Sequence, residues 1–185
     1  MIKTEYRFAV ALKTLMAEVP LDDISVTLLC KKCQVKRQTF YYHFHDIYDL
    51  LTLVFLSEEV EGIKEVKNIR QMIKTIFAYY NANRAFIDAT MNSACKDLFQ
   101  EFVFNNCYHS LLHLINTDIE SKKLHLNDKK AIARFYGMAF SNSIVYYLST
   151  HKTKTADGLL LSLSFEDDES IHRAVLKYQK QRSEV

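Results

Sequence analysis

One stretch of the sequence, residues 27–44 (TLLCKKCQVKRQTFYYHF), constrains the fold more than any other. It predicts a short helix, a tight connection at Gln34 and Val35, and a second short helix. Polar and basic side chains in the second helix lie between the apolar positions Val35, Phe40 and Phe44. Two short helices joined by a turn, the second rich in basic, amide, hydroxyl and phenol groups, are typical of a helix-turn-helix that reads DNA.

Positive charge is concentrated in this stretch. The net charge of the whole chain is only +2, so general attraction to a polyanion is not its main property. Residues 28–45, however, contain Lys31, Lys32, Lys36 and Arg37 and no acidic residue. Such a patch is the electrostatic footprint of a nucleic-acid site, although a run of charges alone is also typical of an ordinary solvated face.

The remainder of the chain also predicts helices. Only 3 Gly and 1 Pro interrupt 185 residues, and apolar residues recur at spacings of three and four. We predict an all-α protein with an N-terminal three-helix, helix-turn-helix DNA-binding domain in residues 1–55. A larger C-terminal helical domain for dimerisation and ligand binding is predicted in residues 56–185. The boundary lies in the polar end of a fourth helix, which is predicted to run to about Ile63 and contains Gly62.

Local signals predict where several helices begin. Ser25 and Asp46 are suitable N-caps for the second and fourth helices, because short polar side chains accept hydrogen bonds from free backbone N–H groups. Asn127 or Asp128 is predicted to cap a long helix that runs from about residue 129 to residue 149. The acidic segment EDDES is predicted to begin the last helix.

The long helix over residues 129–149 is apolar on more than one face, so it needs a partner on each side. Three small residues, Gly137, Ser141 and Ser143, allow another helix to approach closely. We therefore predict that this helix forms a dimer interface. Aromatic residues elsewhere in the C-terminal part can line a ligand pocket or fill an ordinary core, and both interpretations remain open.

The segments LDDISV, QTFYYHF and DIYDLL closely resemble the N-terminal region of the TetR/AcrR family of bacterial transcription regulators. Within that family, the most similar branch includes regulators of dihydroxyacetone kinase operons. The resemblance covers residues 1–55 well and the remainder only in helical pattern. The characteristic positions that match are Val35, Thr39, Phe40, Tyr41, His43 and Phe44.

This resemblance implies an all-helical homodimer whose N-terminal domain binds a near-palindromic operator in double-stranded DNA. It also implies a C-terminal domain that dimerises through its last two long helices and commonly encloses a small-molecule pocket. The DNA contacts of the family carry over to Thr27, Lys36, Arg37, Gln38, Thr39, Tyr41, Tyr42 and His43.

The chemistry of these side chains suits DNA. Arg37 can pair with guanine and Gln38 with adenine in the major groove, and Thr39 can contact a thymine methyl group. Tyr41 and His43 lie further along the helix and are better placed for phosphates, which set register rather than read sequence.

Two positions depart from the family pattern. The turn has Gln34 where the family usually has Gly, so a left-handed backbone there is slightly strained. The fourth helix has Ile47 between Asp46 and Tyr48 where the family often has a phosphate-binding Lys.

Two clusters invite a metal interpretation. Cys30, Cys33, His43 and His45 have the spacing C-x2-C-x9-H-x-H, which misses zinc-finger spacing, and the family places small core residues at both cysteine positions. We expect no metal there.

His109 and His113 lie one helical turn apart and can face one ligand or metal, but Cys107 lies off their shared face. A pair of histidines on an exposed or pocket-lining face is the simpler interpretation.

We therefore predict a TetR-type transcription regulator that is switched by a small molecule or partner bound to its C-terminal domain. A protein-interaction module, tethered to DNA by its N-terminal domain, is the alternative. No glycine-rich phosphate loop or recognisable nucleophile indicates an enzyme, and we expect no cofactor. The sequence contains no membrane-spanning apolar run, so we expect a cytoplasmic protein with reduced cysteines.

Overall fold

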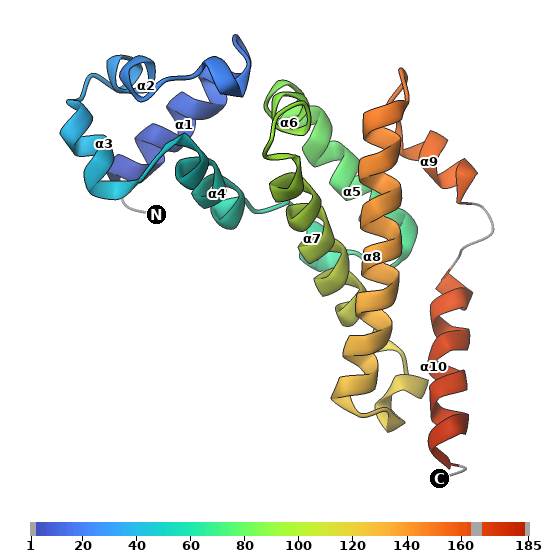
Figure 1. Cartoon of the computed structure of the whole chain (residues 1–185). Coiled ribbons are helices and arrows are strands. Elements are labelled where there is room, and N and C mark those ends of the chain that lie inside the picture. Colours follow the sequence, from blue (N-terminus) through green and yellow to red (C-terminus); the bar gives the residue numbers. More distant parts are fainter. Residues whose placement is uncertain (1–2, 164–167, 184–185) are drawn as a thin grey trace. The chain divides into compact units, whose positions relative to one another are not determined.

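A computed structural model describes residues 3–163 and 168–183, and all regular elements in these ranges are helical (Figure 1). The all-α prediction is confirmed. The elements are α1 (Lys3–Met16), η1 (Leu21–Asp23), α2 (Val26–Cys33), α3 (Arg37–His43), α4 (Ile47–Ser57), η2 (Ile63–Glu65), α5 (Ile69–Ala82), α6 (Arg84–Met91), α7 (Lys96–Thr117), η3 (Glu120–Lys123), α8 (Leu126–Thr150), α9 (Ala156–Ser162) and α10 (Asp168–Ser183).

The chain packs as two compact units. One contains residues 1–59 and 80–102, and the other contains residues 60–79 and 103–185. The helices α6 and the first part of α7 therefore pack with the N-terminal helices, although they lie far away in sequence. The assignment of DNA binding to residues 1–55 alone stays a prediction.

Aromatic packing holds the later segments of the first unit against α4. The ring of Phe55 stacks on Phe86 with centroids 5.2 Å apart, and it lies 5.5 Å from the ring of Phe102. The ammonium of Lys13 lies 5.1 Å from the Phe86 ring centroid and 2.8 Å from Oε1 of Glu58. Burying each such aromatic side chain contributes about 1.5–3 kcal/mol, so α6 is an integral part of this core.

Two of the predicted N-caps are confirmed. The Ser25 hydroxyl accepts a hydrogen bond from the backbone N–H of Leu28 at 3.1 Å. The Asp46 carboxylate accepts one from the N–H of Asp49 at 2.8 Å. Both contacts satisfy N–H groups that have no partner within the helix.

The predicted end of the fourth helix is wrong. The helix α4 ends at Ser57 rather than near Ile63. The next residue, Glu58, has extended backbone while its carboxylate pairs with Lys13, and Gly62 then adopts a left-handed φ of 77° before η2. The tertiary ion pair and the glycine turn thus both lie in the stretch that was predicted to be helical.

The predicted cap of the long helix is also wrong. The helix α8 begins at Leu126, and its N-cap is His125 rather than Asn127 or Asp128. Asp128 is instead the third helical residue, where a carboxylate is still favourable because it faces the positive end of the helix dipole.

The small residue Gly137 brings two helices of the second unit together. A Cβ atom at this position would lie 3.3 Å from Cα of Tyr108 on α7, which is tighter than an ordinary contact, so glycine lets α7 and α8 approach more closely than a larger residue would. The close approach that Gly137 was expected to provide for a dimer is therefore used within the chain. Phe135, Met138 and Tyr146 on the other side of α8 are exposed, and its role as a dimer interface stays a prediction.

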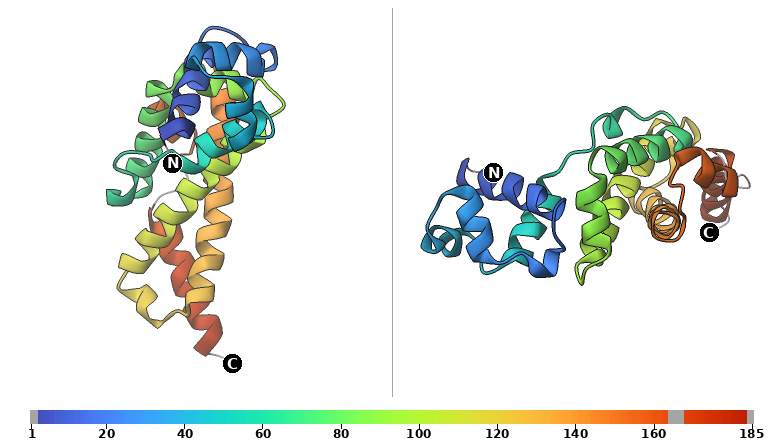
Figure 2. Two further views of the ribbon diagram at one scale, coloured as in Figure 1. Left: turned by 90° about the vertical axis from the view of Figure 1, so that its left-hand side faces the viewer. Right: turned by 90° about the horizontal axis from the view of Figure 1, so that it is seen from above.

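The last helix, α10, lies beside the N-terminal half of α8 (Figures 1 and 2). The Tyr136 hydroxyl donates to the backbone carbonyl of Ser170 at 3.2 Å. Two acids of the EDDES segment, Glu166 and Asp167, lie outside the described residues, and α10 begins at Asp168. Among the described helices, none has the length and apolar character needed to cross a bilayer.

A histidine–carboxylate pair fastens α10 to the end of α7. Nδ1 of His172 lies 2.8 Å from Oδ2 of Asp118. This hydrogen bond to the carboxylate raises the pKa of His172. Burial favours the protonated form of Asp118, but its hydrogen bonds with His172 and the Glu120 N–H outweigh burial, and the pKa of Asp118 falls below its usual value.

These directions predict how pH changes stability. The raised pKa of His172 gives stabilisation that is complete below about pH 6.5 and lost as pH rises through the folded-state value. The lowered pKa of Asp118 gives stabilisation that is present above about pH 4 and lost in stronger acid. We expect His172→Ala to lower the Tm more at pH 5.5 than at pH 8.5, measured by circular dichroism.

The partner substitution Asp118→Asn provides the matched control, and it should remove the same pH-dependent part of the Tm. An equal loss of Tm at both pH values in His172→Ala would show that the histidine stabilises α10 by packing and not by its charge.

Candidate nucleic-acid interface

The turn between α2 and α3 is built on a left-handed residue. Gln34 has φ 52° and ψ 45°. Its N–H donates to the carbonyl of Lys31 at 3.2 Å, and the N–H of Val35 donates to the carbonyl of Cys30 at 3.0 Å. This pair of bonds is a Schellman motif, which satisfies the last carbonyls of a helix and normally has glycine at the left-handed position.

The recognition segment is held in place by three phenylalanines. The Phe40 ring on α3 meets the Phe8 ring on α1 edge to face, with centroids 5.4 Å apart. Phe44 lies 6.0 Å from Phe8 and 5.4 Å from Phe40, and all three side chains are buried. Because α3 has only 7 residues, it cannot be stable alone, so this packing fixes its orientation.

Two hydrogen bonds between Arg7 on α1 and Cys33 hold the end of α2 in place. Nη2 of Arg7 donates to the carbonyl of Cys33 at 2.6 Å, and Sγ of Cys33 donates to the carbonyl of Arg7 at 3.7 Å. Sequence reasoning did not identify Arg7 as a support for the turn. Its role depends on a contact between residues 26 positions apart, for which the local pattern carries no signal.

Most of the predicted DNA-contacting residues lie on the surface. The exposed side chains are Thr27, Lys36, Arg37, Gln38, Tyr41 and Tyr42, while those of Thr39 and His43 are half-buried. Tyr42 is the most accessible of the exposed aromatic residues here, with an exposed fraction of 85%. The side chains that α3 does not use for packing are therefore presented to solvent.

His43 has a contact that the sequence did not suggest. Its side chain is only 10% exposed, and its Nδ1 lies 3.6 Å from Oε1 of Glu5 on α1. The imidazole thus packs between α3 and the first helix, which limits its reach toward a phosphate. Whether His43 contacts DNA stays a prediction.

The start of α4 differs from the pattern expected for the family. Ile47 is buried, so it cannot replace the missing lysine. Tyr48 is exposed, but its hydroxyl donates to Oδ1 of Asp22 at 3.4 Å, and the Asp22 carboxylate raises the pKa of this phenol. Asp22 and Asp46 near this phenol are unfavourable for a phosphate, so the start of α4 adds no positive charge to that of α2 and α3.

The cysteines of α2 belong to the core. Cys30 and Cys33 are both buried, and burial raises the pKa of each thiol. A metal ligand must be a thiolate, so this environment disfavours a zinc site. Within residues 3–163 and 168–183, no group of three or more His, Cys, Asp or Glu side chains is arranged to hold a metal ion.

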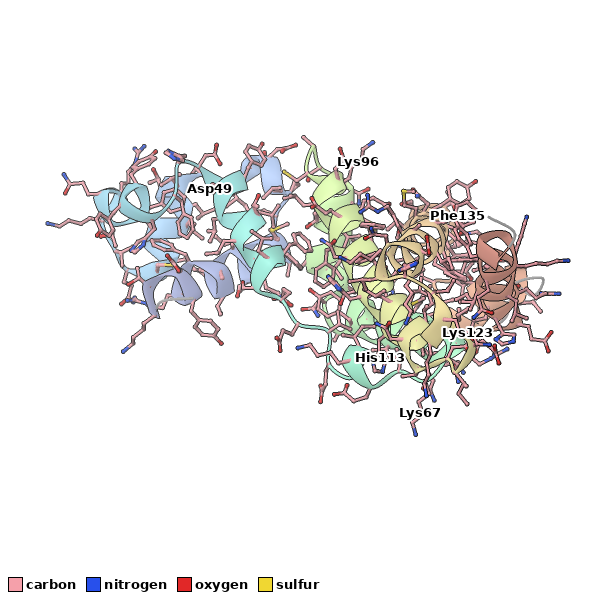
Figure 3. All side chains as sticks on the ribbon, turned by 90° about the horizontal axis from the view of Figure 1, so that it is seen from below. Asp49, Lys67, Lys96, His113, Lys123 and Phe135 are labelled. Carbon is pink, nitrogen blue, oxygen red and sulfur yellow. The ribbon has the colours of Figure 1, made fainter. Side chains whose placement is uncertain are left out.

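His109 and His113 on α7 line one groove of about 280 Å³ together with Ile63, Lys64, Asn105, Asn106 and Ser110. His113 lies toward the C-terminal end of the helix (Figure 3). Cys107 is fully buried, and burial raises the pKa of its thiol, so the structure keeps it apart from the two histidines. The pair lines a surface groove and does not form a three-ligand cluster.

Comparison with known proteins agrees with this architecture. A TetR-type family model, described as a transcriptional regulator C-terminal region, matches residues 67–163 of the 185-residue chain. The chain belongs to the TetR family of transcriptional regulators. The predicted family is thereby confirmed, by a match that lies in the C-terminal part of the chain.

Among solved structures, the protein described as dihydroxyacetone kinase operon activator DhaS is similar to this TetR-family chain. The two share 20% identity with a TM-score of 0.63, over 97% of this chain and 98% of that chain. No curated protein matches the chain in a sequence comparison. At this identity the similarity to DhaS shows the fold alone, namely an all-helical protein with an N-terminal helix-turn-helix.

Because Gln34 has a left-handed backbone, replacing it by glycine is predicted to stabilise the protein. We expect Gln34→Gly to raise the free energy of unfolding by about 0.5–1 kcal/mol, because glycine removes the strain of a side chain at positive φ but adds backbone entropy to the unfolded chain. Urea denaturation measures this change.

Lys31→Gly is the matched control, since Lys31 is an exposed residue with helical backbone in the last turn of α2, and it should destabilise the protein by about 1 kcal/mol. A loss of stability in Gln34→Gly as large as in the control would contradict the strain at residue 34.

Proposed function

We propose that the chain is a homodimeric, sequence-specific DNA-binding regulator whose two α3 helices enter successive major grooves of a near-palindromic operator. The observation that carries the proposal is that α3 uses one side chain for core packing and exposes its polar side chains to solvent. Phe40 packs into the core, while Arg37, Gln38 and Tyr41 on the same helix are exposed. A rigidly docked helix with polar side chains facing outward is what reading of base edges requires.

Charge supports the same proposal. Lys31, Lys32, Lys36 and Arg37 are all exposed on α2, on α3 or at the start of α3. Nζ of Lys32 lies 3.7 Å from an oxygen of Glu18, so Lys31, Lys36 and Arg37 are the charges of this group that most directly attract phosphates. Short-range attraction of this kind orients the protein on the duplex, and contacts to bases then provide specificity.

The side of α8 that faces away from α7 fits a second copy of the chain. Phe135, Met138 and Tyr146 on this face are exposed, with exposed fractions of 66% for Phe135 and 68% for Tyr146. Their spacing of three to eight residues places them along one stripe of the helix. A twofold contact through this stripe would put two recognition helices on one operator.

A groove between α8 and α10 extends this surface. It has a volume of about 630 Å³ and is lined by Ala131, Ile132, Phe135, Tyr136, Ser170, Arg173, Ala174, Lys177 and Tyr178. An effector or partner that binds the C-terminal part better in one arrangement would shift the spacing of the two α3 helices. Those helices must lie about 34–36 Å apart to enter successive grooves.

The exposed stripe on α8 also favours a second candidate, in which the C-terminal part binds a different protein and the N-terminal part tethers the complex to DNA. Exposed aromatic side chains suit either partner, because tyrosine and phenylalanine are enriched in protein interfaces. DhaS is named as an operon activator, so activation is proposed here beside repression as a regulatory outcome.

Selection of bound duplexes from a random DNA pool by the purified protein tests the proposal. The expected result is a near-palindrome whose half-sites are about one helical turn apart. A folded dimer that enriches no sequence would contradict autonomous operator binding and would favour the partner-dependent alternative.

If α3 reads bases, removing one of its base-contacting side chains should reduce operator affinity and change the preference at one base position. We expect Arg37→Ala or Gln38→Ala to weaken operator binding by about 1–3 kcal/mol and to relax the base preference at one position per half-site. Competition between operators that differ at single positions measures the effect.

Lys31→Ala is the control, because it removes a charge on α2 and should weaken all duplexes equally. If Arg37→Ala behaves like Lys31→Ala, Arg37 contacts phosphate and not a base.

If the exposed stripe on α8 is the dimer interface, a charged side chain introduced into it should weaken the dimer. We expect Phe135→Glu to weaken the dimer roughly 10- to 100-fold, because one buried aromatic side chain contributes about 1.5–3 kcal/mol. Sedimentation equilibrium measures the dissociation constant.

Leu161→Glu is matched to it, since Leu161 on α9 is also highly exposed but lies outside the stripe. A dimer of unchanged strength in Phe135→Glu would exclude this face from the interface.

A further inference from the structure

Arg37 and Tyr41 touch each other on the exposed face of α3. They are four residues apart, one turn of the helix. Nη2 of Arg37 donates a hydrogen bond to the Tyr41 hydroxyl oxygen at 3.2 Å, and the guanidinium carbon lies 5.8 Å from the ring centroid. The tyrosine therefore holds the guanidinium both by a hydrogen bond and by its ring.

The Tyr41 ring is itself supported by the core. Its edge meets the Phe40 ring at 84° with centroids 5.5 Å apart. Phe40 is fully buried and is packed between Phe8 and Phe44. The order of contacts thus runs from α1 through Phe40 to Tyr41, and from Tyr41 to the exposed guanidinium.

This arrangement affects how an arginine can read a base. A free arginine side chain samples many rotamers, and fixing it on binding opposes affinity. Because the Tyr41 oxygen accepts from Arg37, the phenol O–H remains a donor for a second group, such as a phosphate oxygen. One pair of side chains can therefore connect a base contact to a phosphate contact.

We propose that Tyr41 is a positioning residue for Arg37, and that it sets the base preference at the operator position that Arg37 reads. The inference rests on the proposed DNA-binding function. It differs from a simple phosphate contact, for which loss of the Tyr41 hydroxyl would weaken specific and random DNA by the same factor.

The test is a double-mutant cycle on full-length protein with four variants: wild type, Tyr41→Phe, Arg37→Ala and the double variant. Each is measured on the selected operator and on a random duplex of equal length and at equal salt. Tyr41→Phe should weaken operator binding about three- to tenfold and flatten the base preference at the Arg37 position. On the random duplex, and in the Arg37→Ala background, its effect should be about twofold or less.

Two further variants separate the contribution of the Tyr41 hydroxyl from that of its ring and from that of the neighbouring phenol. Tyr41→Leu removes both the hydroxyl and the ring, so it should flatten the base preference further than Tyr41→Phe. Tyr42→Phe removes the adjacent phenol, whose ring packs on His43 with centroids 5.0 Å apart. Its effect should be the same in the Arg37→Ala background as in wild type.

A measurement without DNA separates failure of the inference from failure of the proposed function. The ¹⁵N relaxation order parameter of Arg37 Nε in the free protein should fall in Tyr41→Phe and fall further in Tyr41→Leu, but not in Tyr42→Phe. If wild type binds no duplex, the proposed function fails, and this order parameter still decides whether Tyr41 orders the guanidinium.

Two results would overturn the inference. One is an equal loss in Tyr41→Phe on the operator and the random duplex, with the same loss in the Arg37→Ala background. The other is an Arg37 side chain as mobile in wild type as in Tyr41→Leu.

Discussion

The candidate interface depends on the packing of Phe40 against Phe8 and Phe44. A helix of 7 residues forms too few backbone hydrogen bonds to offset its own ordering entropy, so α3 exists because Phe40, and Phe44 at its end, are buried. The rings meet at angles of 89° for Phe8 with Phe40 and 88° for Phe8 with Phe44. Since edge-to-face contacts are directional, this cluster fixes the rotation of α3 about its axis and with it the residues that face solvent.

The turn before α3 is the complementary constraint. A left-handed backbone at Gln34 ends α2 and turns the chain, and hydrogen bonds to the carbonyls of Cys30 and Lys31 complete the end of that helix. A side chain at positive φ costs free energy that glycine would not, so the surrounding contacts must hold this conformation. The Arg7 hydrogen bond to Cys33 and the buried side chains of Cys30 and Cys33 supply such contacts. The strain is therefore local and is offset by tertiary structure.

Features that depend on neighbours in sequence were predictable. Ser25 and Asp46 cap their helices because the side chain and the N–H that it accepts from are only three residues apart. The end of α4 was not predictable in this way, because its C-cap Glu58 pairs with Lys13, 45 residues away, a contact for which the local sequence carries no signal. The packing of α6 with the N-terminal helices has the same character, since the Phe55–Phe86 stack joins distant parts of the chain. Gly137 illustrates a third case, in which a small residue indicated close approach correctly but its partner, α7, could not be identified from spacing.

The same distinction applies to the candidate site. Helical periodicity was sufficient to separate the buried Phe40 from the exposed Arg37, Gln38 and Tyr42. It could not show that His43 packs against Glu5 on α1, because that contact requires the tertiary structure. The Arg37–Tyr41 contact lies between these cases: a spacing of four residues allows it, but only the packing of Tyr41 on Phe40 makes the phenol a fixed acceptor. Residues that looked equivalent as DNA contacts thus differ physically, because some are free surface groups and others are oriented by the core.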